Sequence, residues 1–216
     1  MSAASLSQKN RITGGLVDRN QPLGFRFDGQ HYTGFVGDTL ASALLANNVR
    51  LVGRSFKYHR PRGILTAGSE EPNALVTIGH GAHQDPNSRA TTAQLFEGIS
   101  AESQTKMGLL SFDLMAVNDF LSPLLGAGFY YKTFMWPAAF WEKIYEPIIR
   151  KAAGLGSLSG LADPDQYDKG YLHCDLLVIG SGPSGLMAAL VAAKSGLQII
   201  LADEDFCLGG RLNAER

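Results

Sequence analysis

Three glycines near the C-terminal end of the sequence have a spacing that suits the binding of a diphosphate. Gly180, Gly182 and Gly185 form the pattern G-x-G-x-x-G, and an alanine-rich stretch, 186–195, follows them. Gly180 permits a tight turn, Gly182 lets the backbone approach a pyrophosphate, and Gly185 lets a helix pack closely on a strand. The N–H groups and the positive dipole end of the following helix then face the phosphates.

The elements around these glycines complete a recognisable unit. The apolar runs 176–179 and 197–202 have the character of buried parallel strands. Asp203 ends the second run, 18 positions after Gly185, and the spacing expected for an acid that binds a ribose hydroxyl is about 20. Strand, turn, helix, strand and acid predict the first βαβ unit of a Rossmann-type dinucleotide-binding domain. Two alternatives stay open: a glycine turn that serves packing alone, and a strand-end acid that only meets solvent.

The charges beside the predicted ribose indicate which nucleotide is bound. Asp203 and Glu204 would repel the 2′-phosphate of NADP, so NAD is expected in this chain. FAD presents the same ribose, and Arg211 could neutralise a phosphate. The candidate cofactor-binding residues are Gly180, Gly182, Ser184, Gly185, Asp203, Glu204, Gly210 and Arg211.

Composition excludes several other classes of protein. The chain has 216 residues, 45% of them hydrophobic, and a formal net charge of -1, which is typical of a soluble globular protein without a nucleic-acid surface. Residues 176–193 are uncharged, but their glycines and proline favour a turn over a membrane span. The N-terminus lacks the apolar core of a secretion signal, and Cys174 and Cys207 are expected to be reduced thiols, so a cytoplasmic location is predicted.

The first half of the chain predicts a β-grasp fold. After a polar arm, 1–22, the alternation in 23–27 and the Asp28-Gly29 pair predict a hairpin whose return strand is 32–36. Asp38 is the expected N-cap of a helix whose apolar stripe includes Leu40 and Leu44. Further strands are expected at 74–78 and 91–96.

Two polar segments of this half could bind ligands. The basic stretch 53–63 could dock onto an acidic partner or a cofactor phosphate, could be a solvated loop, or, against the balanced net charge, could bind nucleic acid. His80, His83 and Asp85 share one loop, but a metal site is not expected because no further ligand stands nearby.

Residues 107–160 are apolar and contain two expected helices, around 109–125 and 138–153. Their aromatic content exceeds what a connector needs, so burial against a neighbouring domain or subunit is expected. Because the predicted Rossmann unit stops after two strands, the sequence is expected to be the N-terminal piece of a larger polypeptide. The aromatic residues are Phe129, Tyr130, Tyr131, Phe134, Trp136, Phe140, Trp141 and Tyr145.

Five blocks in this order resemble the alpha subunits of heterotetrameric sarcosine oxidases. The blocks are GDTLASALLAN, GRSFKYHRPRGI, GFYYKTFMWP, YEPIIRKAAGLG and GSGPSGL. The resemblance implies an oxidoreductase that demethylates sarcosine with oxygen as electron acceptor and tetrahydrofolate as one-carbon acceptor. It implies NAD in this chain, FAD and FMN in the complex, and beta, gamma and delta subunits as partners. It implies no catalytic residue in this segment. The alternative is a nucleotide-binding assembly module of a related amine, opine or proline dehydrogenase, without chemistry of its own.

The resemblance also extends to ferredoxin-like domains of related dehydrogenases, which carry C-x4-C-x2-C and a later cysteine. Laid along this sequence, the four ligand positions fall on Thr66, Glu71, Ala74 and Thr91. Because none of these is a cysteine, we expect no iron–sulfur cluster.

The expected fold class is therefore α+β followed by α/β. The predicted domains are an arm (1–22), a ferredoxin-like β-grasp domain without iron–sulfur ligands (23–106), a helical connector and linker (107–171), and the start of a Rossmann domain (172–216).

Overall fold

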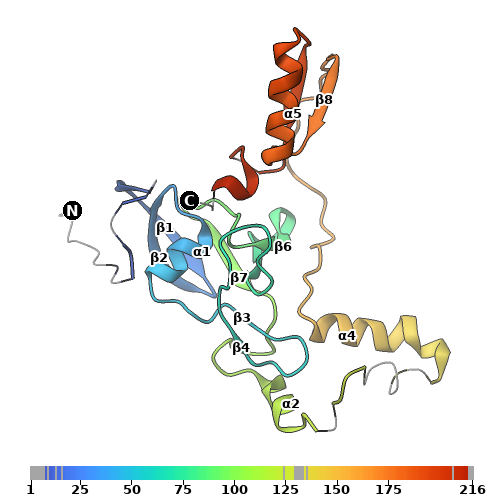
Figure 1. Cartoon of the computed structure of the whole chain (residues 1–216). Helices are drawn as coiled ribbons and strands as arrows, with labels where there is room; N and C mark the ends of the chain where they lie inside the picture. Colours follow the sequence, from blue (N-terminus) through green and yellow to red (C-terminus); the bar gives the residue numbers. More distant parts are fainter. Residues whose placement is uncertain are drawn as a thin grey trace.

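The computed structural model shows two folded parts joined by an extended segment (Figure 1). A five-stranded sheet covered by one helix forms the first part, and a strand–helix–strand unit forms the second. Residues 155–174 between them form no helix or strand. The structure describes residues 8, 10–12, 14–15, 17–123, 125–128, 134, 136–205 and 207–213.

The predicted hairpin is present and is longer than expected. Strand β1 runs over Asp18–Phe27 and pairs antiparallel with β2, Gln30–Val36. The two turn residues, Asp28 and Gly29, have φ angles of 47° and 78°, the left-handed values that a two-residue hairpin turn of type I′ requires. The strand therefore starts at Asp18, within the stretch expected to be a polar arm.

Helix α1, Leu40–Ala46, follows the hairpin, and its cap differs from the prediction. Thr39, not Asp38, is the N-cap: its hydroxyl accepts the N–H of Ser42, whose own hydroxyl accepts the N–H of Thr39. Asp38 lies one position earlier and is buried, with 1% of its surface exposed. It is free to pair with another segment because Thr39 and Ser42 already close a capping box.

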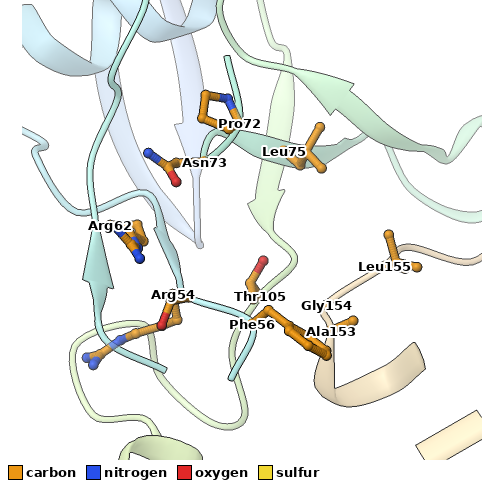
Figure 2. Close-up of a pocket in the computed structure, with 11 residues that line it drawn as sticks. Arg54, Phe56, Arg62, Pro72, Asn73, Leu75, Thr105, Ala153, Gly154 and Leu155 are labelled. Atoms are coloured by element: carbon orange, nitrogen blue, oxygen red, sulfur yellow. The ribbon is translucent and has the colours of Figure 1, made fainter. Parts of the chain in front are cut away.

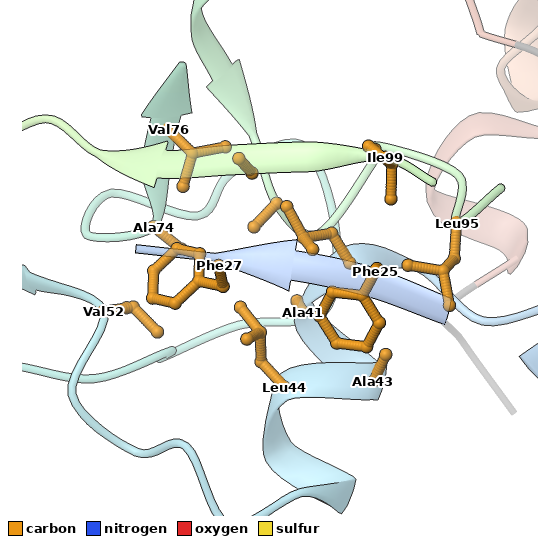
Figure 3. Packing of buried hydrophobic residues seen from close by; sticks show 13 residues of the cluster. Phe25, Phe27, Ala41, Ala43, Leu44, Val52, Ala74, Val76, Leu95 and Ile99 are labelled. Atoms are coloured by element: carbon orange, nitrogen blue, oxygen red, sulfur yellow. The ribbon is translucent and has the colours of Figure 1, made fainter. Parts of the chain in front are cut away.

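The hydrophobic core lies between α1 and the sheet (Figure 3). Leu44 and Ala43 of α1 face Phe25 and Phe27 of β1, all four fully or almost fully buried. Burying one large side chain of this kind contributes about 1.5–3 kcal/mol, so this layer is the main source of stability in the first part.

Three more strands extend the sheet, which has the order β2-β1-β7-β5-β6. They are β5 (Leu75–Ile78), β6 (Asp85–Arg89) and β7 (Ser100–Ser103), of which β7 lies parallel to β1. The strand predicted at 91–96 is wrong. Ala93 N–H bonds back to the Arg89 carbonyl in a turn, and the Ala93 carbonyl accepts the Leu40 N–H at the start of α1. The tertiary contact with α1 thus overrides the local β-propensity.

The basic stretch forms a short hairpin beside this sheet. Strand β3, Gly53–Arg54, pairs antiparallel with β4, Pro61–Arg62. A helix was expected around 109–125. The structure has only a 3-10 turn at Leu114–Ala116 and the short helix α2, Val117–Phe120, among the described residues of this range. A further 3-10 turn, Gly81–His83, separates β5 from β6.

The helix expected over 138–153 occurs in three consecutive pieces. A 3-10 turn (Ala138–Phe140) leads into a π-helical segment (Trp141–Tyr145) and then α4 (Glu146–Ala152). Of the predicted aromatic cluster, Phe129, Tyr130 and Tyr131 lie outside the described residues. Among those described, the Phe134 and Tyr145 ring centroids lie 5.1 Å apart, and Trp136 is 83% exposed.

The second part consists of β8 (Leu176–Ile179), α5 (Pro183–Lys194) and β9 (Ile199–Ala202). The two strands are parallel, with Leu176 opposite Ile199 and Ile179 opposite Ala202, and α5 connects them. A 3-10 turn, Gly210–Asn213, follows. No helix among the described residues is long and apolar enough to span a membrane.

Candidate dinucleotide-binding site

The glycine turn between β8 and α5 has the conformation that its spacing predicts. Gly180 has φ +97°, which a residue with a side chain rarely adopts. A Cβ on Gly185 would lie 1.8 Å from the Gly180 carbonyl oxygen, so only glycine permits this contact between helix and turn. A Cβ on Gly182 would meet nothing within 4 Å, so the backbone there faces open space. Gly180 and Gly185 thus have the backbone conformation and the close contact that the tight turn and the helix packing require, while the approach of a diphosphate to Gly182 stays a prediction.

The N-terminal end of α5 faces the same space without a side-chain cap. Gly182 is the N-cap residue, Pro183 follows it, and no acidic residue lies in the first turn. The first N–H with a partner inside the helix belongs to Leu186, which bonds to the Gly182 carbonyl. The N–H groups of Ser184 and Gly185 are therefore available for an anion, and the positive end of the helix dipole adds to its attraction.

Asp203, at the end of β9, lies against the turn. One carboxylate oxygen accepts the Ser181 N–H, and the other accepts the Asp205 N–H at 2.8 Å. The Asp205 N–H, followed by the Ser181 hydroxyl and N–H, lowers the pKa of Asp203 below its ordinary value. The group is thus a carboxylate at neutral pH. Ser181 and Asp205 thus supply at least three hydrogen-bond donors to this carboxylate, which has about four acceptor positions.

A second pair of glycines returns to the turn after β9. The Gly209 N–H donates to the Ser181 carbonyl at 3.0 Å and to the Ser181 hydroxyl at 3.2 Å, and Ser181 is fully buried. A Cβ on Gly210 would lie 3.3 Å from the Cα of Gly182. The site is therefore built from three segments: the turn, the end of β9, and the double glycine. Ser181 and Gly209 were not among the predicted residues, although the Gly209-Gly210 pair was a visible signal.

The remaining predicted residues lie at the rim of this arrangement. Ser184 is exposed in the first turn of α5, and Glu204 is exposed beside Asp203. Arg211 is exposed in the turn after Gly210. The structure thus brings together Gly180, Gly182, Gly185, Asp203 and Gly210, and the three polar residues beside them are exposed.

The four positions that align with ferredoxin ligands gather in the first part of the chain. The Glu71 carboxylate accepts the N–H groups of Leu65, Thr66 and Asn73 at 2.6–2.8 Å and is 2% exposed. Thr91 donates its hydroxyl to the Gly68 carbonyl of the same loop at 2.7 Å. Glu71 therefore holds the loop 65–73 by filling its centre with a carboxylate.

Replacing Glu71 by glutamine is expected to destabilise this domain by about 1.5–3 kcal/mol, the range for hydrogen bonds to a charged group. Burial opposes ionisation, but the three backbone N–H bonds outweigh it and lower the pKa of Glu71. The stability from this ionisation is fully present above the ordinary glutamate pKa and is lost as the pH falls through the lower folded-state value. Urea unfolding at several pH values should show the difference between wild type and Glu71→Gln shrinking in acid. The exposed neighbour provides the control, since Glu70→Gln should cost almost nothing; equal effects of both variants would contradict this role.

Comparison with known families corrects one prediction in this region. Residues 20–106 match a family described as "2Fe-2S iron-sulfur cluster binding domain". The expectation of no iron–sulfur cluster is contradicted by this match. The residues at the aligned positions do not by themselves supply thiolates, because the two cysteines of the chain, Cys174 and Cys207, both lie outside 20–106. The sequence of the whole domain thus indicates a relationship that the four aligned side chains do not show.

The second part matches a different family. Residues 175–215 match "FAD dependent oxidoreductase", and this range contains the whole glycine turn and both strands. Among solved structures, L-proline dehydrogenase from P. horikoshii is similar with a TM-score of 0.44 and 19% identity, over 90% of this chain and 27% of that one.

Two curated relatives are similar along almost all of the chain. The sarcosine oxidase subunit alpha of Rhizobium meliloti (strain 1021) is 65% identical over 198 residues, which are 92% of this chain and 20% of the relative. That of Corynebacterium sp. (strain U-96) is 36% identical over 205 residues, 94% of this chain and 16% of the relative. The chain thus spans a fifth or less of these relatives' length. The resemblance expected from the sequence is confirmed: over nine-tenths of its length, this chain is similar to the alpha subunits of sarcosine oxidase.

Proposed function

We propose that the β8–α5–β9 unit is the first βαβ unit of a Rossmann-type domain and binds the ADP portion of a dinucleotide. The observation that carries the proposal is the uncapped N-terminus of α5, placed behind a glycine turn whose backbone faces open space at Gly182. The diphosphate would bind the N–H groups of Ser184 and Gly185, and the adenosine ribose would bind the Asp203 carboxylate. The ADP portion is common to NAD and FAD, and the family matched by 175–215 is FAD-dependent.

We further propose that the chain is part of an enzyme that oxidatively demethylates sarcosine to glycine, in the cytoplasm. The similarity to sarcosine oxidase alpha subunits supports this proposal. Oxygen would accept the electrons and tetrahydrofolate the one-carbon unit. A bound flavin or nicotinamide would supply the redox chemistry, while the residues of this chain would bind and orient its ADP portion.

Exposed apolar side chains support the proposal that other subunits contact this chain. The name of the relatives, subunit alpha, implies further subunits in those enzymes. Phe120 is 87% exposed, and Phe112 is 72% exposed, in the segment after the sheet. Large exposed apolar side chains in one region are typical of an interaction surface, so we assign this segment to contacts with beta, gamma or delta subunits. Other exposed apolar residues of the same region are Leu109, Leu114, Val117, Leu121, Trp136, Phe140, Trp141, Ile144 and Ile148.

Titration of the native protein with NAD, NADP and FAD, after removal of bound nucleotide, tests the proposed site. NAD is expected to bind more tightly than NADP, because the 2′-phosphate would lie against Asp203 and Glu204. Asp203→Ala is expected to weaken binding by about 1–3 kcal/mol, or roughly 5- to 150-fold, through loss of the ribose hydrogen bonds.

Asp168 provides a matched control, because it is an exposed aspartate in the extended segment, away from the turn. Asp168→Ala should leave all three affinities unchanged. If NAD and NADP bind equally, or if Asp203→Ala binds like the wild type, then Asp203 does not contact the ribose. Comparison of the NAD and FAD affinities identifies which dinucleotide the site prefers.

A further inference from the structure

A small pocket lies between the sheet domain and the end of α4, separate from the glycine turn (Figure 2). Its volume is about 200 Å³. Figure 2 shows Arg62 and Asn73 on one side and Ala153, Gly154 and Leu155 on the other. The pocket therefore joins the basic hairpin, the loop before β5, and the first residues of the extended segment.

The charge of the pocket lining is entirely positive. The lining residues include two arginines, Arg54 and Arg62, and no aspartate or glutamate. Arg54 donates to the carbonyl oxygens of Leu110 and His59 at 2.7–3.0 Å. These acceptors are neutral, so they satisfy the N–H groups of Arg54 but leave its charge uncompensated. A pocket of this kind attracts anions.

Arg62 is the group best placed to bind such an anion. Among the described residues its side chain makes no hydrogen bond and no ion pair, whereas the side chain of Arg60, two positions earlier, pairs with Asp119 at 2.6 Å. The side chains of Asn73 and Thr105 also line the pocket and also lack hydrogen-bond partners among the described residues. A planar guanidinium with a neighbouring amide and hydroxyl suits a carboxylate, which accepts two parallel N–H bonds.

The rest of the lining is apolar and limits the size of the ligand. Phe56, Leu75 and Leu155 present aromatic and aliphatic surface. Pockets for nucleotides and drug-sized molecules are about 300–1,000 Å³, so this one is too small for a dinucleotide. We propose that the pocket binds a small organic carboxylate, with the carboxylate on Arg62 and the apolar body against Phe56 and Leu75.

Such a ligand would also contact the segment that leads to the second part of the chain. Gly154 lines the pocket, and its carbonyl accepts the Gln104 side chain at 3.1 Å. The next glycine, Gly156, donates its N–H to Asn87 at 3.0 Å. The extended segment is thus already attached to the sheet domain at this point. A bound carboxylate would add contacts between residues 153–155 and the sheet domain. It would therefore slow the local opening by which this segment detaches from that domain.

Benzoate and its uncharged counterpart benzamide are suitable probes for the native protein. Isothermal titration should show benzoate binding about tenfold or more tightly than benzamide, because only benzoate carries the charge that Arg62 recognises. Arg62→Gln should weaken benzoate binding by about tenfold or more. Hydrogen exchange should show that benzoate protects the amides of 153–155, and that Arg62→Gln removes the protection. Arg89→Gln, at an exposed arginine on β6, is the control and should change neither measurement.

Several results would overturn the proposal. They are the absence of benzoate binding, equal affinity for benzamide, and unchanged affinity or protection in Arg62→Gln. Inorganic phosphate supplies a further arm: if it binds more tightly than benzoate, the pocket recognises an oxyanion alone and the apolar contacts have no role. Because Arg62 is exposed, its replacement should not unfold the protein, and the outcome reports on binding.

Discussion

Replacement of Gly185 by alanine is expected to weaken dinucleotide binding strongly and to destabilise the βαβ unit. The new Cβ would lie 1.8 Å from the Gly180 carbonyl oxygen, a backbone atom that can move only if the turn moves. Overpacking of this kind costs about 1–3 kcal/mol or more. Displacing α5 also removes its N–H groups from the diphosphate, so affinity should fall by at least about a hundredfold. Nucleotide titration measures the binding, and hydrogen exchange in α5 measures the local stability.

Gly182→Ala separates binding from folding at the same turn. Gly182 has φ −63°, which alanine adopts freely, and its Cβ would meet nothing within 4 Å. The variant should therefore keep the hydrogen exchange of the wild type. Its methyl group would nevertheless occupy the space through which the backbone approaches a pyrophosphate, so binding should weaken by about tenfold or more. Wild-type affinity in Gly182→Ala would show that no diphosphate approaches this turn.

The second large effect is expected at the start of the chain. Arg11 donates two N–H bonds to the Asp38 carboxylate, at 2.9 and 2.7 Å, and its guanidinium lies 5.2 Å from the Phe35 ring centroid. Asp38 is buried, and it also accepts the Phe35 N–H and the Ser42 hydroxyl. Arg11→Ala would leave a buried carboxylate without its cation, at a cost of about 3 kcal/mol. Urea unfolding, followed by the exchange of α1 amides, should show this loss.

Arg26 provides the control, because it is an exposed arginine on β1. Arg26→Ala should change the free energy of unfolding by no more than about 0.5 kcal/mol. If the two variants are equally stable, the pair between Arg11 and Asp38 is not a source of stability. In that case the residues before β1 would not be part of the folded domain.

Local patterns in the sequence predicted the elements that depend on local chemistry. The Asp28-Gly29 pair predicted the hairpin because a two-residue turn needs left-handed backbone at both positions. The glycine spacing predicted the turn before α5 because Gly180 needs a positive φ and Gly185 needs the space that a Cβ would take. Both signals lie within a few residues of the structure that they specify.

Features that depend on distant partners could not be predicted in this way. Asp38 has the sequence context of an N-cap, but in the structure its carboxylate pairs with Arg11, 27 residues away in the chain. Residues 91–96 have strand propensity, yet they turn to meet the start of α1. The buried Glu71 holds its loop through backbone N–H groups, which no side-chain pattern shows. The match of residues 20–106 to an iron–sulfur family likewise depends on the whole domain and not on four positions.

The most direct test of the proposed function is a crystal structure of the native protein with its dinucleotide bound. We expect the diphosphate oxygens within about 2.7–3.2 Å of the Ser184 and Gly185 nitrogens, the range of N–H···O hydrogen bonds. We also expect the Asp203 carboxylate to accept the adenosine ribose hydroxyls while keeping its bond from the Ser181 N–H. A dinucleotide bound elsewhere, with no phosphate at the N-terminus of α5, would contradict the proposal.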